Sequence, residues 1–209
     1  MTGDRPAAFV PVAPGETRLL ARAARNDAAE RARERRLVRE VQRGSSEALE
    51  ELFRREWPRA YRAAYLVVHD AAAAEDIAQE AFLAAVRAID RFDRRRPFGP
   101  WMHRIVVNRA IDVARARALR REVDAAAGET EEAPPDEPSL PFSDQVLEAL
   151  RGLGPEQRAV VALRYLFDYT PGEIARALEL PRGTVNSRLR RALDRLAEVL
   201  EAEPVEEPR

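Results

Sequence analysis

Apolar residues recur every three or four positions along two stretches of the chain, residues 31–121 and 145–200. This period matches one face of an α-helix, so the pattern predicts helices throughout both stretches. Residues 31–66 predict one or two helices, interrupted at Gly44-Ser45-Ser46, where Ser46 is a suitable cap for the second helix. The apolar positions of this segment predict core packing and no functional site.

The segment from Ala71 to Ile89 predicts the next helix, with one apolar side and one polar side. The polar side carries a large apolar residue and three polar neighbours: Leu83, Asp76, Gln79 and Glu80. An exposed leucine is ordinary by itself, but one set among acidic and amide groups also suits a surface that binds a partner.

Residues 91–121 are strongly basic, with ten arginines and two aspartates. Pro97, Gly99 and Pro100 predict a loop at the start, and a helix is expected from Trp101 onward. Four residues share one face of that helix because they are spaced by four, four and three positions: Arg104, Asn108, Asp112 and Arg115. Guanidinium groups neutralise phosphates and aromatic rings stack on unpaired bases, so this segment suits a nucleic-acid strand. By itself, the same pattern is also typical of a solvated basic helix over core aromatic residues.

The second stretch has the parts of a helix-turn-helix. Thr170-Pro171-Gly172-Glu173 is a capping box that begins a short helix, a turn follows at Glu179-Leu180-Pro181, and a longer helix runs from about Gly183 to Leu200. Polar and basic residues gather near the start of the longer helix: Arg182, Thr184, Ser187, Arg188 and Arg191. In a helix-turn-helix these positions enter the major groove of duplex DNA. A plain helical bundle with a charged exterior is the alternative.

Charge is segregated along the chain although the formal net charge is only −1. Residues 31–121 carry an excess of eight positive charges, whereas residues 122–144 carry eight acidic residues, no basic residue and several prolines. That composition predicts a flexible acidic linker between two basic domains. Residues 1–30 predict a disordered extension, with a helix forming from Glu16 onward, and residues 201–209 form an acidic tail. The expected fold is therefore all-α, with two small helical domains joined by the linker.

Several classes of site are disfavoured by composition. The chain has no cysteine and only two histidines, which excludes disulfides and thiolate metal sites and makes a histidine-based metal site unexpected. No apolar run has the length of a membrane span, and no signal-peptide core stands at the N-terminus. We therefore expect a cytoplasmic protein with no cofactor, no metal and no small-molecule substrate.

Both stretches resemble one protein family. The first resembles region 2 of bacterial σ70-family sigma factors through these motifs: Ala74-Glu75-Asp76-Ile77-Ala78-Gln79-Glu80-Ala81-Phe82, Pro97-Phe98-x-x-Trp101-Met102-x-x-Ile105-x-x-Asn108 and Asp112. The second resembles region 4 through Leu163-Arg164-Tyr165, Tyr169-Thr170-x-x-Glu173-Ile174-Ala175 and Gly183-Thr184-Val185-x-Ser187-Arg188-Leu189-x-Arg191-Ala192. With only a linker between the two regions, the layout is similar to the extracytoplasmic-function (ECF) group.

The resemblance implies a role for each surface. Asp76, Gln79, Glu80 and Leu83 would dock on the β′ clamp of core RNA polymerase, and the β flap would be a second polymerase contact. The following residues would capture the melted non-template strand of the −10 promoter element: Phe92, Arg94, Arg95, Arg96, Phe98, Arg104, Asn108, Asp112 and Arg115. Arg182, Thr184, Ser187, Arg188 and Arg191 would read the −35 element, and an anti-sigma factor is a further expected partner. The protein itself would catalyse nothing.

Two departures from the family pattern and three alternative functions remain. The loop is more basic at Arg94–Arg96 than in common family members, so a −10 base preference does not carry over. Glu179 stands where many helix-turn-helix proteins have glycine. The alternatives are a helix-turn-helix regulator that acts without polymerase, an enzyme for which no catalytic constellation is visible, and a sigma-like protein that no longer starts transcription.

Overall fold

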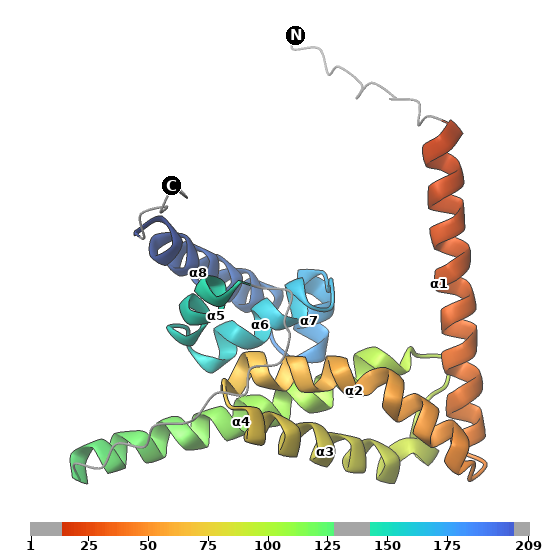
Figure 1. Cartoon of the computed structure of the whole chain (residues 1–209), viewed down its shortest axis with the longest axis horizontal. Coiled ribbons are helices and arrows are strands. Elements are labelled where there is room, and N and C mark those ends of the chain that lie inside the picture. The colour runs from red at the N-terminus through yellow and green to blue at the C-terminus, as the bar shows by residue number, and fades with distance from the viewer. Residues whose placement is uncertain (1–13, 128–142, 203–209) are drawn as a thin grey trace, which may run out of the picture.

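The computed structural model describes residues 14–127 and 143–202, and in these ranges helices are joined by short loops, without a strand (Figure 1). The elements are α1 (Pro14–Val41), α2 (Ser46–Val68), α3 (Ala71–Ala88), the short 3₁₀ helix η1 (Ile89–Arg91), α4 (Phe98–Ala127), α5 (Asp144–Arg151), α6 (Pro155–Tyr165), α7 (Pro171–Ala177) and α8 (Arg182–Ala202). We call α1–α4 the N-terminal unit and α5–α8 the C-terminal unit. The all-α prediction is confirmed.

Local hydrogen bonds explain where several helices begin. Ser45, not Ser46 as predicted, caps α2, because its side chain accepts a hydrogen bond from the backbone N–H of Ala48 at 3.2 Å. Asp70 caps α3 in the same way through the N–H of Ala73 at 2.6 Å. The predicted capping box at α7 is present, with Thr170 and Glu173 each bonding to the other's backbone N–H.

Three helix boundaries differ from the sequence prediction. Helix α1 begins at Pro14, two residues before the helix expected from Glu16 onward, and residues 1–13 lie outside the described residues. Helix α4 begins at Phe98 instead of Trp101, because Gly99 and Pro100 lie in its first turn, where backbone N–H groups have no helical partner. It also continues through Ala127, which extends six residues into the predicted linker. Residues 128–142 of that linker and residues 203–209 of the tail lie outside the described residues.

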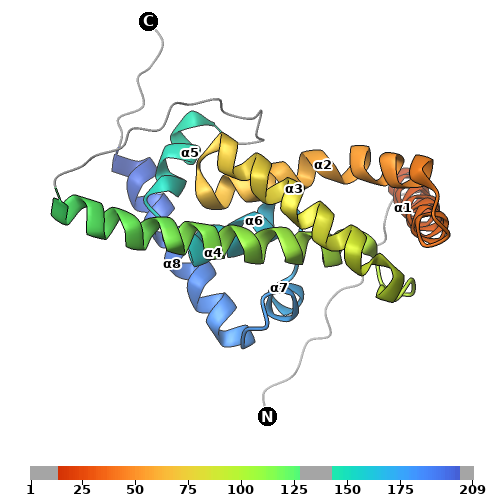
Figure 2. The ribbon, with the colours of Figure 1, turned by 90° about the horizontal axis from the view of Figure 1, so that it is seen from below.

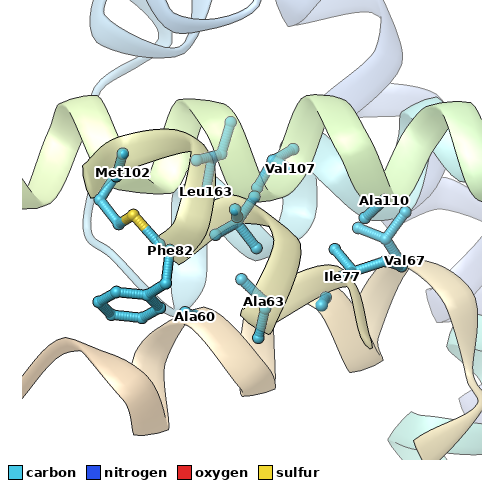
Figure 3. Close-up of a cluster of buried hydrophobic side chains, with 14 of the residues drawn as sticks. Ala60, Ala63, Val67, Ile77, Phe82, Met102, Val107, Ala110 and Leu163 are labelled. Atoms are coloured by element: carbon cyan, nitrogen blue, oxygen red, sulfur yellow. The ribbon is translucent and has the colours of Figure 1, made fainter. Parts of the chain in front are cut away.

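The two units share their apolar core. One cluster of buried side chains contains residues of α1–α4 together with Val160 and Leu163 of α6. Figure 3 shows Leu163 in this cluster with Met102 and Val107 of α4. A second cluster joins Leu66 of α2 to residues of α5, α6 and α8. In Figures 1 and 2 the C-terminal unit accordingly lies against α2 and α4, whereas the upper part of α1 extends away from the body.

Helix α6 makes this arrangement possible because it is apolar on all sides. Five consecutive residues, 159–163, are between 0% and 3% exposed. A helix that is apolar all round has to be covered on every side. Here α2 and α4 cover one side of α6, and α8 covers another.

The turn of the helix-turn-helix holds Glu179 in the left-handed backbone region, with φ of 54°. This conformation explains why a glycine is common at this position, and it costs an L-residue about 1–2 kcal/mol. The glutamate therefore occupies the expected turn without changing its geometry.

We expect Glu179→Gly to be more stable than Glu179→Ala by about 1 kcal/mol, because both lose the carboxylate and only glycine relieves the left-handed strain. Urea denaturation of the two variants measures the difference. Equal urea midpoints for the two variants would contradict the proposed backbone strain at residue 179.

Candidate nucleic-acid interface

Helix α4 presents the predicted polar face. Arg104 and Asn108 are half-buried, and Asp112 and Arg115 are exposed. The opposite side carries Met102, Val106 and Ala110, which are all fully buried. The four polar residues therefore line one edge of a helix whose position is determined by the core beneath it.

Two arginines of this edge form ion pairs with the C-terminal unit. Arg104 pairs with Glu179 in the turn between α7 and α8. Arg115 pairs with Glu156 in the first turn of α6, with 2.5 Å between Nη2 and Oε1. Burial raises the pKa of the Glu156 carboxyl, but the hydrogen bond from Arg115, a backbone hydrogen bond at Glu156 and the charges of Arg115 and Arg188 outweigh it, so the pKa lies below its ordinary value. One carboxylate is thus paired with an arginine of the predicted −10 surface and is also influenced by the charge of an arginine of the predicted −35 surface.

The loop before α4 exposes Arg94, Arg95 and Arg96 to solvent. Asp93 shapes the loop, since its side chain accepts a hydrogen bond from the N–H of Arg95 at 3.0 Å and its carbonyl accepts one from Arg96 at 2.9 Å. No carboxylate of the described residues is paired with these three guanidinium groups. Three positive charges are therefore available to a phosphate backbone.

Phe92 and Phe98 are predicted to contact a single DNA strand, but both side chains are buried in this structure. They are 9% and 2% exposed, and both pack against Trp101, with ring centroids 4.7 and 5.5 Å from it. Neither ring offers a free face for stacking on a base in this structure. Hydrophobic burial holds the two rings in the core, and from there they support the loop that connects them.

The predicted polymerase surface on α3 is exposed. Asp76, Gln79, Glu80 and Leu83 all face solvent, and Leu83 is 54% exposed. Glu80 and Leu83 line a groove of about 430 Å³ between α3 and α4, which α4 completes with Ile105 and Arg109.

Arg109 was not among the residues singled out from the sequence. Its Nε lies 2.7 Å from Oε2 of Glu80, and this hydrogen bond raises the pKa of Arg109. The only sequence signal is its spacing of four residues from Ile105, which places both on one side of α4. The groove thus joins the two helices that carry the predicted polymerase and −10 surfaces.

The start of α8 presents the predicted −35 residues. Arg182 and Arg191 are exposed, and Thr184, Ser187 and Arg188 are half-buried. Val185 and Leu189 anchor the helix from its other side, at 0% and 8% exposure. Arg191 donates hydrogen bonds to the carbonyl and the hydroxyl of Ser187, at 3.3 and 3.4 Å. This geometry suits insertion of the helix start into a major groove.

The contact between the two units contains both histidines of the chain. The ring of His103 on α4 stacks on Phe167 at 3.7 Å between centroids, and its Nδ1 lies 3.1 Å from the hydroxyl of Tyr169. Burial lowers the pKa of His103, although the nearby Glu56 opposes the shift. At the end of α2, burial lowers the pKa of His69 to about 3, and the charges of Arg158 and Arg151 add to the effect. Both rings are therefore held neutral where the units meet.

No group of three or more metal-ligating side chains gathers within residues 14–127 and 143–202. None of the helices in the same ranges combines the length and the apolar character that crossing a membrane requires.

Two family models match the chain: "Sigma-70 region 2" over residues 52–121 and "Sigma-70, region 4" over residues 143–196. The chain is 30% identical over 176 residues to the ECF RNA polymerase sigma factor SigW of Bacillus subtilis, a similarity that covers 78% of this chain and 94% of that protein. It is 32% identical over 162 residues to the RNA polymerase sigma factor CarQ of Myxococcus xanthus, covering 75% of this chain and 91% of that one.

Solved structures are similar as well. CnrH, in complex with the cytosolic domain of CnrY, has a TM-score of 0.61 and 27% identity, covering 82% of this chain and 99% of CnrH. The sigma factor RpoE of Bartonella quintana, in complex with the anti-sigma factor NepR, has a TM-score of 0.60 and shares the fold at 23% identity, covering 74% of this chain and 98% of that one.

We expect the free energy of unfolding to fall by about 1–2 kcal/mol between pH 7 and pH 5 through His69. Its pKa is lower in the folded protein than in the unfolded chain, so the contribution is complete above about pH 6.5, the ordinary histidine pKa, and is lost as the pH falls toward 3. His69→Asn removes the titration, and asparagine tolerates the left-handed backbone at this position, where φ is 52°. Urea denaturation of both proteins at the two pH values measures the effect. An equal loss in the variant would contradict this assignment.

Proposed function

Because this chain belongs to the extracytoplasmic-function group of σ70-family RNA polymerase sigma factors, it directs promoter-specific transcription initiation, and we propose that it does so with three separate surfaces. One surface binds core polymerase, a second holds the melted −10 strand, and a third reads the −35 duplex. The observation that carries this proposal is the placement of a basic α4 edge and a helix-turn-helix within the stretches matched by the region 2 and region 4 models.

The polymerase surface is the exposed side of α3, with Asp76, Gln79, Glu80 and Leu83 facing the β′ clamp. Its exposure and the adjoining groove support this role, because Leu83 places an apolar group at the centre of an otherwise polar face. The groove gives a partner side chain a place to enter beside the Glu80–Arg109 pair. The C-terminal unit would make the second polymerase contact, at the β flap.

The −10 surface combines the loop Arg94–Arg96 with the edge formed by Arg104, Asn108, Asp112 and Arg115. The three loop arginines lie free in solvent and suit the phosphates of a single strand. Asn108 and Asp112 provide hydrogen-bonding groups on the same face of α4 as Arg104 and Arg115, as the recognition of a base that has left the stack requires. Phe92 and Phe98 serve this surface by supporting the loop.

The −35 surface is the start of α8. Arg182, Thr184, Ser187, Arg188 and Arg191 supply the guanidinium and hydroxyl groups that contact base edges and phosphates in a major groove. The α7 helix and its capping box hold this end of α8 in place.

Promoter binding requires the two units to separate. In the structure, Glu179 forms an ion pair with Arg104, and Glu156 forms one with Arg115. The C-terminal unit therefore neutralises these two positive charges of the α4 edge. Binding of polymerase and DNA would replace these carboxylates by phosphates. We also propose that the protein acts in the cytoplasm, performs no catalysis of its own, and is a target for an anti-sigma factor, as the relative bound to NepR is.

Run-off transcription with purified bacterial core polymerase on a genomic promoter library tests the proposal. Transcripts that share two spaced motifs are expected with wild type. Asp76→Arg should lose co-purification with core polymerase, because it reverses a charge on the docking face. Arg188→Ala should keep core binding and lower −35-dependent transcription by about tenfold, the effect of losing one good base contact.

Arg190→Ala is the matched control, because Arg190 is an exposed arginine of α8 that is not part of the proposed surface. It should transcribe like wild type. If wild type produced no new transcripts, the proposed function would be contradicted. If Asp76→Arg still bound core polymerase like wild type, the assignment of the α3 surface would be contradicted.

A further inference from the structure

The loop of residues 92–97 has few hydrogen bonds of its own. Apart from the turn at Asp93, no other described hydrogen bond joins two of its residues. A loop with so few internal bonds takes its shape from the way in which its two ends are held. Both ends are held by residues of α1 or directly after it, which precede the stretch matched by the region 2 model.

Gln42 holds the start of the loop. It follows α1 directly, and its side-chain Nε2 donates hydrogen bonds to the carbonyl of Ile89 at 2.7 Å and to that of Phe92 at 3.2 Å. The two bonds use both hydrogens of the amide, one on the first residue of η1 and one on the residue that follows η1. The direction in which the chain leaves η1 is therefore coupled to α1.

Glu34 holds the end of the loop. It lies on α1, is 8% exposed, and its Oε1 accepts a hydrogen bond of 2.5 Å from the backbone N–H of Phe98. Phe98 is the first residue of α4, so its N–H has no partner within the helix. A carboxylate at this place also suits the positive end of the α4 dipole. Glu34 thus caps α4 from another helix, 64 residues away in the sequence.

We propose that Gln42 and Glu34 are positioning residues for −10 recognition: together they fix both ends of the loop and so place Arg94–Arg96 against the melted strand. The inference rests on the proposed function of this loop. Neither side chain touches DNA in this proposal. Each acts through backbone groups at the loop ends, and the rings of Phe92, Phe98 and Trp101 pack against one another beside those ends.

Gln42→Leu and Glu34→Leu remove these bonds with little change in volume, and Glu34→Gln keeps an oxygen acceptor for the N–H of Phe98. Glu30→Leu is the matched control, because Glu30 lies one turn earlier on α1 and pairs with Arg55 of α2 at 2.8 Å. Each variant is assembled with core polymerase. Affinity for a fluorescent single strand carrying the −10 motif found in the transcription experiment is then measured by anisotropy, with the motif intact and with each base replaced.

We expect the two leucine variants to bind the intact −10 strand about five- to tenfold more weakly, because each loses an anchoring hydrogen bond to the loop. They should also discriminate less between the intact and replaced motifs. Glu34→Gln and Glu30→Leu should behave like wild type, and all four should bind core polymerase and −35 duplex normally.

A purely structural role predicts a different result. If the two side chains only stabilised the fold, the leucine variants would have a lower melting temperature and would bind core polymerase, the −10 strand and the −35 duplex more weakly together. Base discrimination would not be lost selectively, and that outcome would overturn the proposal. So would leucine variants that discriminate −10 bases as well as wild type. Failure of wild type itself to bind the −10 strand would instead contradict the proposed function of the loop.

Discussion

The structure depends on the burial of α6 from both sides. Burying one valine or leucine side chain contributes about 1.5–3 kcal/mol, and α6 places Val160, Val161 and Leu163 in two adjoining cores. The exposed ion pairs between the units contribute about 0–1 kcal/mol each by comparison. Apolar contact therefore holds the C-terminal unit against α2 and α4, and the ion pairs set which polar groups face one another.

That constraint has a direct consequence for charge. Once α6 is seated, Glu156 in its first turn comes to lie against Arg115, and the turn after α7 brings Glu179 to Arg104. Two carboxylates of the C-terminal unit then occupy positions on α4 where phosphates would bind. The groups that neutralise the α4 edge are therefore folded residues of α6 and of the α7–α8 turn.

Sequence reasoning succeeded where structure is determined locally. The α7 capping box is a spacing of four residues, and the buried side of α3 follows from helical period alone. It failed where packing alone separates two interpretations of the same pattern, and where partners are distant in the sequence. Phe92 and Phe98 among arginines look the same in sequence whether they stack on bases or fill a core, and only their packing on Trp101 decides. Glu34 and Gln42 carried no signal, because the backbone groups that they bind lie 47 or more residues away.

The contact between the two units also divides the proposed −10 surface into two parts with different availability. Arg94–Arg96 are exposed on a loop that is held by α1 and does not depend on the C-terminal unit. Arg104 and Arg115 are engaged by that unit and become free only when it moves. A single strand approaching the protein with its two units in contact would therefore meet the loop first, through phosphate charges that carry little sequence information. The α4 edge, with Asn108 and Asp112, would follow after α6 separates from α2 and α4, and the proposed base recognition would then be coupled to the separation of the two units.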